Sequence, residues 1–135
     1  MTGNHNLVDL IGALVALFLP RCSDGETLSE LQGMVMAQED WHKARGLFGR
    51  IRLKNLAAAK AGNLPLEAQY CFEETCAKTL YNLSQGVAPF DADSPQWIVP
   101  NAIALGRHLG LPETEVTARL GPNNSFKPMP LRGTA

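Results

Sequence analysis

Glu73 is the residue of this chain with the clearest capacity for acid–base chemistry. A helix predicted from about Pro65 to Ser84 places it within an apolar sector that also contains Leu66, Tyr70, Ala77, Leu80 and Tyr81. A carboxylate that is removed from water must be neutral, paired or hydrogen-bonded. In an enzyme, Glu73 would therefore act as an acid or base beside Cys76, Tyr70 and an arginine of the basic segment that precedes its helix.

The same position has a structural interpretation, which we favour. Glu73 would then pair with a Lys or Arg of the basic segment that precedes its helix, or it would lie at the wet edge of the apolar sector. Ion pairs of this kind also shift the pKa of a carboxyl group, so burial alone does not indicate catalysis.

The basic segment lies between Trp41 and Gly62, and it holds six basic residues and no acidic one, although the formal net charge of the chain is only −1. These residues are Lys43, Arg45, Arg50, Arg52, Lys54 and Lys60. Residues 1–40 hold six acids against Arg21 alone, and residues 63–99 hold five against Lys78 alone. Such segments either attract one another inside the fold or form a surface for a partner.

A helix through the basic segment would bury an apolar stripe made of Trp41, Ala44, Phe48 and Ile51. Three of the six basic residues, Lys43, Arg50 and Lys54, line one flank of that stripe. We therefore predict these three as the partner-binding residues. Their positive charge favours a partner that is acidic.

The elements that must position these residues are all predicted to be helices, because the chain has no period-two runs. Helices are expected from Asn6 to Leu19, from Pro65 to Ser84 and from Pro112 to Leu120. The region from Thr27 to Gly62 is expected to form one helix or two. A helical turn is expected from Pro95, and a new helix from Pro100 to Leu109. Asp24 or Thr27 is expected to cap the second region, with Glu30 at capping-box spacing from Thr27. Gly46 and Gly49 indicate a break or close packing within it.

The fold class is therefore a single compact all-α domain of five or six helices. It is predicted to cover residues 1–121. Residues 122–135 are rich in proline and glycine, and we predict a flexible or loosely docked tail there.

Residues 102–120 resemble a helix-turn-helix, because four apolar residues fall where that motif packs its two helices: Leu105, Leu109, Leu111 and Val116. Arg119 departs from the pattern at a position that is usually apolar. Glu113 and Glu115 would also face DNA phosphates at the docking end of the second helix. A DNA-binding regulator is thus an alternative, and a plain corner between two helices is the favoured interpretation.

Other chemistries find no support in the sequence. It has no nucleophile elbow and no phosphate-binding glycine loop. Glu39 and His42 have the spacing of one half of a di-iron site, but the second half is missing. We predict no metal and no cofactor.

The composition bounds the remaining choices. A pI near 6.3 disfavours a surface built for nucleic acid, and the apolar run from Leu7 to Leu19 is too short to span a membrane. Three cysteines, an odd number, favour reduced thiols and a cytoplasmic location. We expect a non-catalytic interaction protein, of the inhibitor, immunity or adaptor type. A protein is the expected partner, with a second copy of the chain as the alternative.

Overall fold

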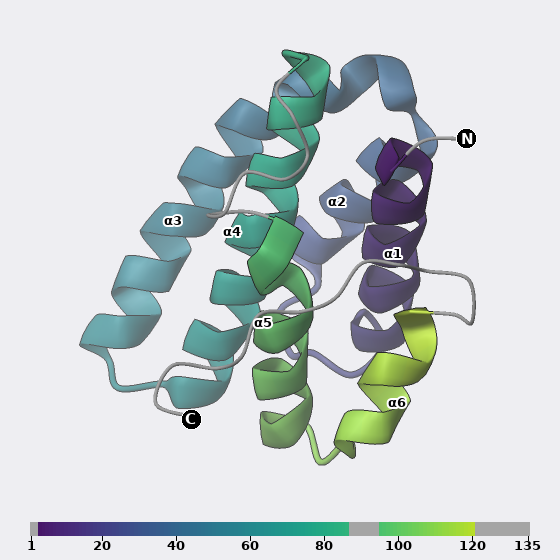
Figure 1. Cartoon of the computed structure of the whole chain (residues 1–135). Coiled ribbons are helices and arrows are strands. Elements are labelled where there is room, and N and C mark those ends of the chain that lie inside the picture. The colour runs from purple at the N-terminus through teal and green to yellow at the C-terminus, as the bar shows by residue number, and fades with distance from the viewer. Residues whose placement is uncertain (1–2, 87–94, 121–135) are drawn as a thin grey trace.

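The computed structural model of the protein describes the backbone of residues 3–86 and 95–120, and the side chains of residues 7–37, 41–86 and 97–119. Within these ranges there are six α-helices, two short 3-10 helices and no strand (Figure 1). They are α1 (Gly3–Phe18), α2 (Glu26–Met36), η1 (Gln38–Lys43), α3 (Ala44–Lys60), α4 (Leu64–Ser84), α5 (Pro95–His108), α6 (Glu113–Thr117) and η2 (Ala118–Leu120). The prediction of a compact all-α fold is confirmed. The predicted tail at 122–135 lies outside the described residues.

The helices are arranged around α4, the longest of them (Figure 1). α3 and α5 pack against it on either side, and α1 packs against α2 while also contacting α4, α5 and η2. Phe18 of α1 and Phe72 of α4 meet edge to face with ring centroids 5.2 Å apart, and both side chains are fully buried. This aromatic pair marks the centre of the core.

The apolar run near the N-terminus forms α1, as predicted. Its inner face buries Ile11, Leu14 and Val15 completely. Arg21 donates from Nη1 to the carbonyl oxygen of Leu17 at 2.7 Å, and so satisfies a carbonyl group at the end of the helix. Among the described residues, no helix is both long enough and apolar enough to cross a bilayer.

The region from Thr27 to Gly62 forms two α-helices, and the break lies at residues 37–43. Trp41 bridges this break, because its ring nitrogen donates to the carbonyl oxygen of Met34 at 2.8 Å. The break predicted at Gly46 and Gly49 is wrong, and so is the close packing, since a side chain at either position would meet open space. Packing of the buried face of α3 outweighs the helix penalty of about 1 kcal/mol for each glycine.

The turn from α3 to α4 follows the sequence signals closely. Gly62 has a φ of 71°, a left-handed conformation that favours glycine. The side chain of Asn63 accepts a hydrogen bond from the backbone N–H of Leu66 at 3.2 Å and caps α4, with Pro65 in its first turn.

The fresh helix predicted at Pro100 is wrong, since α5 runs without interruption from Pro95 to His108 and contains Pro100. Proline removes one backbone hydrogen bond from a helix and disfavours helical geometry in the residue before it. Here the preceding Val99 is buried together with Ile98 and Ala102. Burial of this apolar face outweighs the local preference.

Candidate functional site

Glu73 lies on α4 with its side chain fully buried, as its place in the apolar sector predicts. Its Oε2 accepts a hydrogen bond of 2.6 Å from the side-chain amide of Gln69, one turn earlier on the same helix. The same Gln69 nitrogen donates to the backbone carbonyl oxygen of Asp24, also at 2.6 Å. Gln69 therefore connects the buried carboxyl group to the loop that precedes α2.

The hydroxyl group of Thr27 on α2 also acts on the carboxyl group of Glu73. Neither Glu73 Oε1 nor Thr27 Oγ1 makes a hydrogen bond of good geometry, although the hydroxyl group still helps to lower the pKa of Glu73. Burial is the larger effect and raises the pKa of Glu73 to about 7, with a further contribution from the carboxylate of Asp24. Glu73 is therefore protonated in mildly acidic solution.

Both structural predictions for Glu73 are wrong. It makes no ion pair with any Lys or Arg whose side chain is described, and it does not lie at a wet edge. The charge of Lys54 lowers the pKa of Glu73, but the ammonium group of Lys54 is hydrogen-bonded to Asp24 and Glu26. Hydrogen bonding and protonation, rather than pairing, allow this carboxyl group to be buried.

Asp24 is the centre of the polar contacts around this site. Its Oδ2 accepts hydrogen bonds from the Tyr70 hydroxyl group at 2.6 Å and from Lys54 Nζ at 3.0 Å. Its Oδ1 accepts from the backbone N–H of Glu26 at 3.2 Å, at the start of α2. The Tyr70 hydrogen bond is the main reason that the pKa of Asp24 is lowered.

Sequence reasoning considered Asp24 only as a helix cap. It does bond the first turn of α2, whereas Thr27, the alternative cap in the predicted capping box, lies inside that helix and is buried. The run Asp24-Gly25-Glu26 before an apolar pattern is a helix-start signal that favours Asp24.

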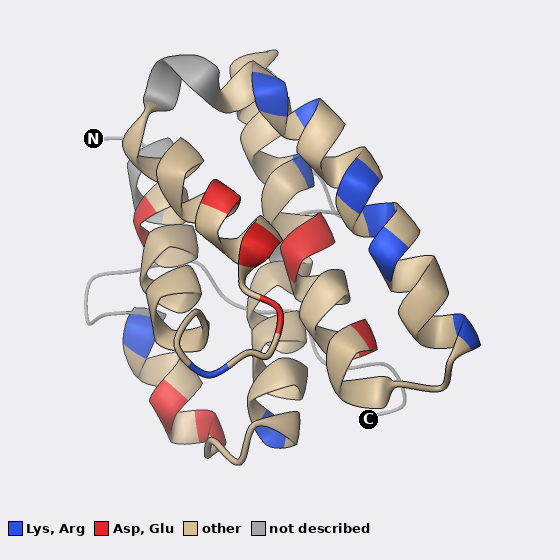
Figure 2. Cartoon of the chain, turned by 180° about the vertical axis from the view of Figure 1, so that it is seen from behind, with Lys and Arg blue, Asp and Glu red and all other residues tan. Residues whose placement is uncertain are grey.

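An ion-pair ladder joins α3 to α2 and to the loop before it. Arg50 forms a bidentate pair with Glu30, at 2.8 and 2.6 Å. One turn further along, Lys54 Nζ contacts Asp24 at 3.0 Å and Glu26 at 2.7 Å. Figure 2 shows acidic residues of α2 facing α3, which carries the basic ones. The acidic and basic segments thus attract one another inside the fold.

This ladder involves two of the three predicted partner-binding residues, Arg50 and Lys54. The third, Lys43, lies on η1 with an exposed side chain. Whether the three bind a partner stays a prediction, but Arg50 and Lys54 already have carboxylates of the same chain beside them.

Glu30→Gln is expected to lower the free energy of unfolding by less than about 1 kcal/mol, because exposed ion pairs contribute little. The difference from the wild type should shrink further in about 1 M salt, which screens exposed charges. Urea unfolding of both proteins at low and high salt measures it. A loss above about 2 kcal/mol that persists in high salt would contradict the assignment of Arg50–Glu30 as a surface pair.

The enzyme alternative placed Cys76 and Tyr70 beside Glu73. Glu73 and Cys76 are fully buried, so a substrate in solvent does not reach them. Tyr70 is 4% exposed and lines a hollow of about 270 Å³ beside Lys54 and Leu66, but neither Glu73 nor Cys76 lines that hollow. Burial also raises the pKa of the Cys76 thiol well above its usual value, which keeps it protonated and unreactive. The three residues are close together, but they form part of the core rather than an open site.

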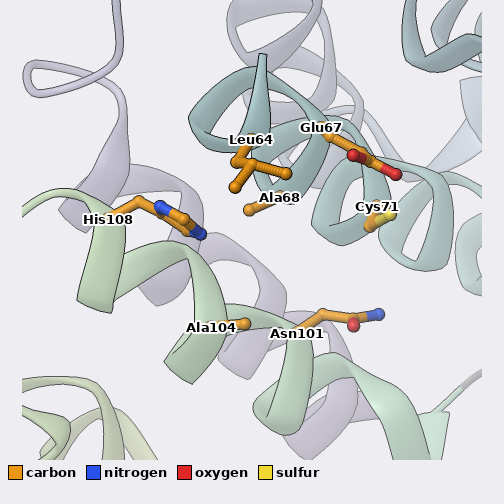
Figure 3. Close-up of a pocket in the computed structure, with 7 residues that line it drawn as sticks. All are labelled: Leu64, Glu67, Ala68, Cys71, Asn101, Ala104 and His108. Atoms are coloured by element: carbon orange, nitrogen blue, oxygen red, sulfur yellow. The ribbon is translucent and has the colours of Figure 1, made fainter. Parts of the chain in front are cut away.

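A hollow of about 250 Å³ lies between α4 and α5, and Glu73 does not line it (Figure 3). It contains the residue types of a cysteine nucleophile with its base: Cys71, His108 and Asn101. However, His108 and Cys71 lie at opposite ends of the hollow, and burial raises the pKa of Cys71. No cluster of side chains that could hold a metal ion occurs among the residues with described positions.

The segment that resembles a helix-turn-helix forms a tight corner. Val116 and Leu105 are buried, and a side-chain carbon added at Gly106 would lie 3.2 Å from Val116. The second helix, α6, has only five residues and begins with Glu113 and Glu115. A recognition helix made of α6 would therefore place fewer than two helical turns in a DNA groove, and its N-terminal end would bring carboxylates close to the phosphates.

The outward face of α3 is the remaining unusual surface, and sequence reasoning missed its apolar part. Leu53 is 69% exposed and Leu56 is 60% exposed, one turn apart on the helix. The same face carries the exposed residues Arg45, Gly49, Arg52 and Lys60. We use the name outward face of α3 for these six residues. The positions of Leu53 and Leu56, outside the apolar stripe predicted to be buried, were the sequence signal for this face.

Comparisons with protein-family models, with curated proteins and with solved structures find no match to this chain.

Proposed function

We propose that this chain is a non-catalytic protein-interaction module that binds an acidic amphipathic helix of another protein through the outward face of α3. The observation that carries the proposal is the exposure of Leu53 and Leu56 on a helix face that has three cations and no carboxylate. Exposed apolar side chains rimmed by charge are typical of interaction surfaces. The opposite face of α3 is already buried in the core.

The shape and charge of this face favour a helical partner. From Arg45 to Lys60 it runs along a straight helix for about 20 Å, at a rise of about 1.5 Å per residue. A partner helix laid along it would cover both leucines with its own apolar residues and place carboxylates near Arg45, Arg52 and Lys60. An inhibitor, an immunity-type protein or an adaptor would each use such a surface.

The proposed surface differs from the three residues predicted from sequence. Arg50 and Lys54 lie toward α2 and are neutralised by its carboxylates, so they offer a partner less unpaired charge. Arg45, Arg52 and Lys60 make no ion pair with the side chains that the structure describes. The predicted cytoplasmic location is kept as part of the proposal, and it agrees with three cysteines that are all free thiols.

A capture experiment with paired variants tests the proposal. The double variant Leu53→Ser/Leu56→Ser should weaken binding of the captured protein at least about tenfold, since burying one leucine contributes roughly 1.5–3 kcal/mol. Arg45→Glu/Arg52→Glu should weaken it as well, with an effect that decreases at high salt. Purified partner and calorimetry then give the affinities.

Met36→Ser is the matched control, because Met36 is 82% exposed but lies on α2. It should leave binding unchanged. Equal capture by all variants would reject the outward face as the binding surface. If sedimentation shows instead that the wild type forms a dimer and the double variant a monomer, the occupant is a second copy and not another protein.

A further inference from the structure

The loop between α1 and α2 is held against α4 by polar contacts that converge on Glu73. The backbone carbonyl of Asp24 accepts from Gln69, and Gln69 also donates to the carboxyl group of Glu73. The side chain of Asp24 accepts from Tyr70, one residue further along the same helix. The contact between this loop and α4 therefore depends on hydrogen bonds rather than on apolar packing alone.

We propose that Glu73 is a pH-sensitive latch, which holds residues 19–25 and the first turn of α2 against α4 while protonated and releases them when ionised. This inference is independent of the binding surface on α3. It concerns a buried acidic group that neither binding nor catalysis uses.

Burial and the carboxylate of Asp24 favour the protonated form of Glu73, and together they outweigh the opposing effects of Thr27, Gln69 and Lys54. Titratable or polar groups interact with it from the loop, α2, α3 and α4: Cys22 and Asp24 of the loop, Thr27 of α2, Lys54 of α3, and Gln69, Tyr70 and Cys76 of α4. The one cation in this group, Lys54, is already shared by Asp24 and Glu26. An ionised Glu73 would thus add a third carboxylate near one ammonium group.

The loop is the part most able to move. Phe72 is fully buried against Phe18 and fixes α4 next to Glu73. The loop residues Pro20, Arg21 and Ser23 are exposed, and Cys22 is partly exposed. Because exposed loops open at a lower free energy than core helices, water should reach an ionised Glu73 by displacement of the loop.

Amide hydrogen exchange tests the latch, with rates corrected for the intrinsic effect of pH. Burial raises the pKa of Glu73 to about 7 in the fold from its ordinary value of 4.5, so ionisation favours the open loop over this interval. In the wild type, the opening equilibrium of amides 22–30 should rise about tenfold per pH unit between pH 5 and 7 and level off above. In Glu73→Gln it should stay constant, because glutamine keeps the hydrogen bonds but cannot ionise.

Glu67→Gln, which removes a partly exposed carboxylate of the same helix, is the control and should behave as the wild type. The same pH dependence in Glu73→Gln would overturn the latch. Opening of amides 22–30 at the same free energy as the amides of α3 and α5 would overturn it too, since the opening would then be global. Should Glu73→Gln fail to fold, a carbon NMR titration of the Glu73 carboxyl group in the wild type decides: a midpoint near 7 supports the latch and one near 4.5 rejects it.

Discussion

Raising the pH from about 4.5 to 8 is expected to lower the free energy of unfolding by about 3 kcal/mol through Glu73 alone. The pKa of this group is raised from 4.5 to about 7 by burial, so the folded state binds the proton more tightly than the unfolded chain. The stabilisation is complete below the unfolded pKa, declines as the pH rises, and is lost above the folded pKa. The interval of change is therefore about pH 4.5 to 7.

Glu73→Gln isolates this effect, because the amide oxygen can still accept from Gln69. Urea unfolding of both proteins at several pH values measures the difference, which should change by about 3 kcal/mol across the interval. Parallel pH profiles would show that Glu73 titrates normally. At lower pH both proteins should lose stability together, since Asp24 and Glu30 have lowered pKa values and their pairs are lost on protonation.

Phe72→Ala is expected to cost about 3–5 kcal/mol, the range for truncation of a fully buried aromatic residue. The substitution leaves a cavity between α1 and α4 and removes the edge-to-face contact with Phe18 at 5.2 Å. Because small domains are stable by only about 5–15 kcal/mol, this loss is a large part of the total. The midpoint of urea unfolding should fall sharply while the slope stays constant.

Two further variants provide reference values for the loss of stability in Phe72→Ala. Phe72→Leu keeps much of the volume and should cost clearly less than Phe72→Ala. Leu53→Ala, on the exposed side of α3, should change stability by no more than about 0.5 kcal/mol. A cost for Phe72→Ala as small as that for Leu53→Ala would contradict the placement of the aromatic pair at the centre of the core.

The helical fold could be predicted because the residues that start and end its helices act locally. The stop at Gly62 and Asn63 and the start at Pro65 act through the backbone of the residues themselves, and the structure follows them. The failures at Gly49 and Pro100 have the opposite cause. There the local preference is weak compared with the burial of an apolar face against distant helices, and a sequence pattern does not give the strength of that packing.

The candidate site shows the same division. Burial of Glu73 could be predicted because its position relative to the apolar residues of one helix can be read from the sequence. Its link to Asp24 does not, because Gln69 and Asp24 are 45 residues apart and meet only through the packing of the loop on α4. The sequence left open whether the acidic and basic segments attract one another or bind a partner. The way in which α2 and α3 pack together determines which cations form ion pairs.

The short turn between α3 and α4 also influences the order of folding. Helices joined by so few residues lose little chain entropy when they meet, so this hairpin is expected to form early. The loop that carries Asp24 must instead close on α4 across a long stretch of chain, and is expected to dock late. Glu73 is then buried after the main folding barrier. Its ionisation should therefore speed unfolding much more than it slows folding.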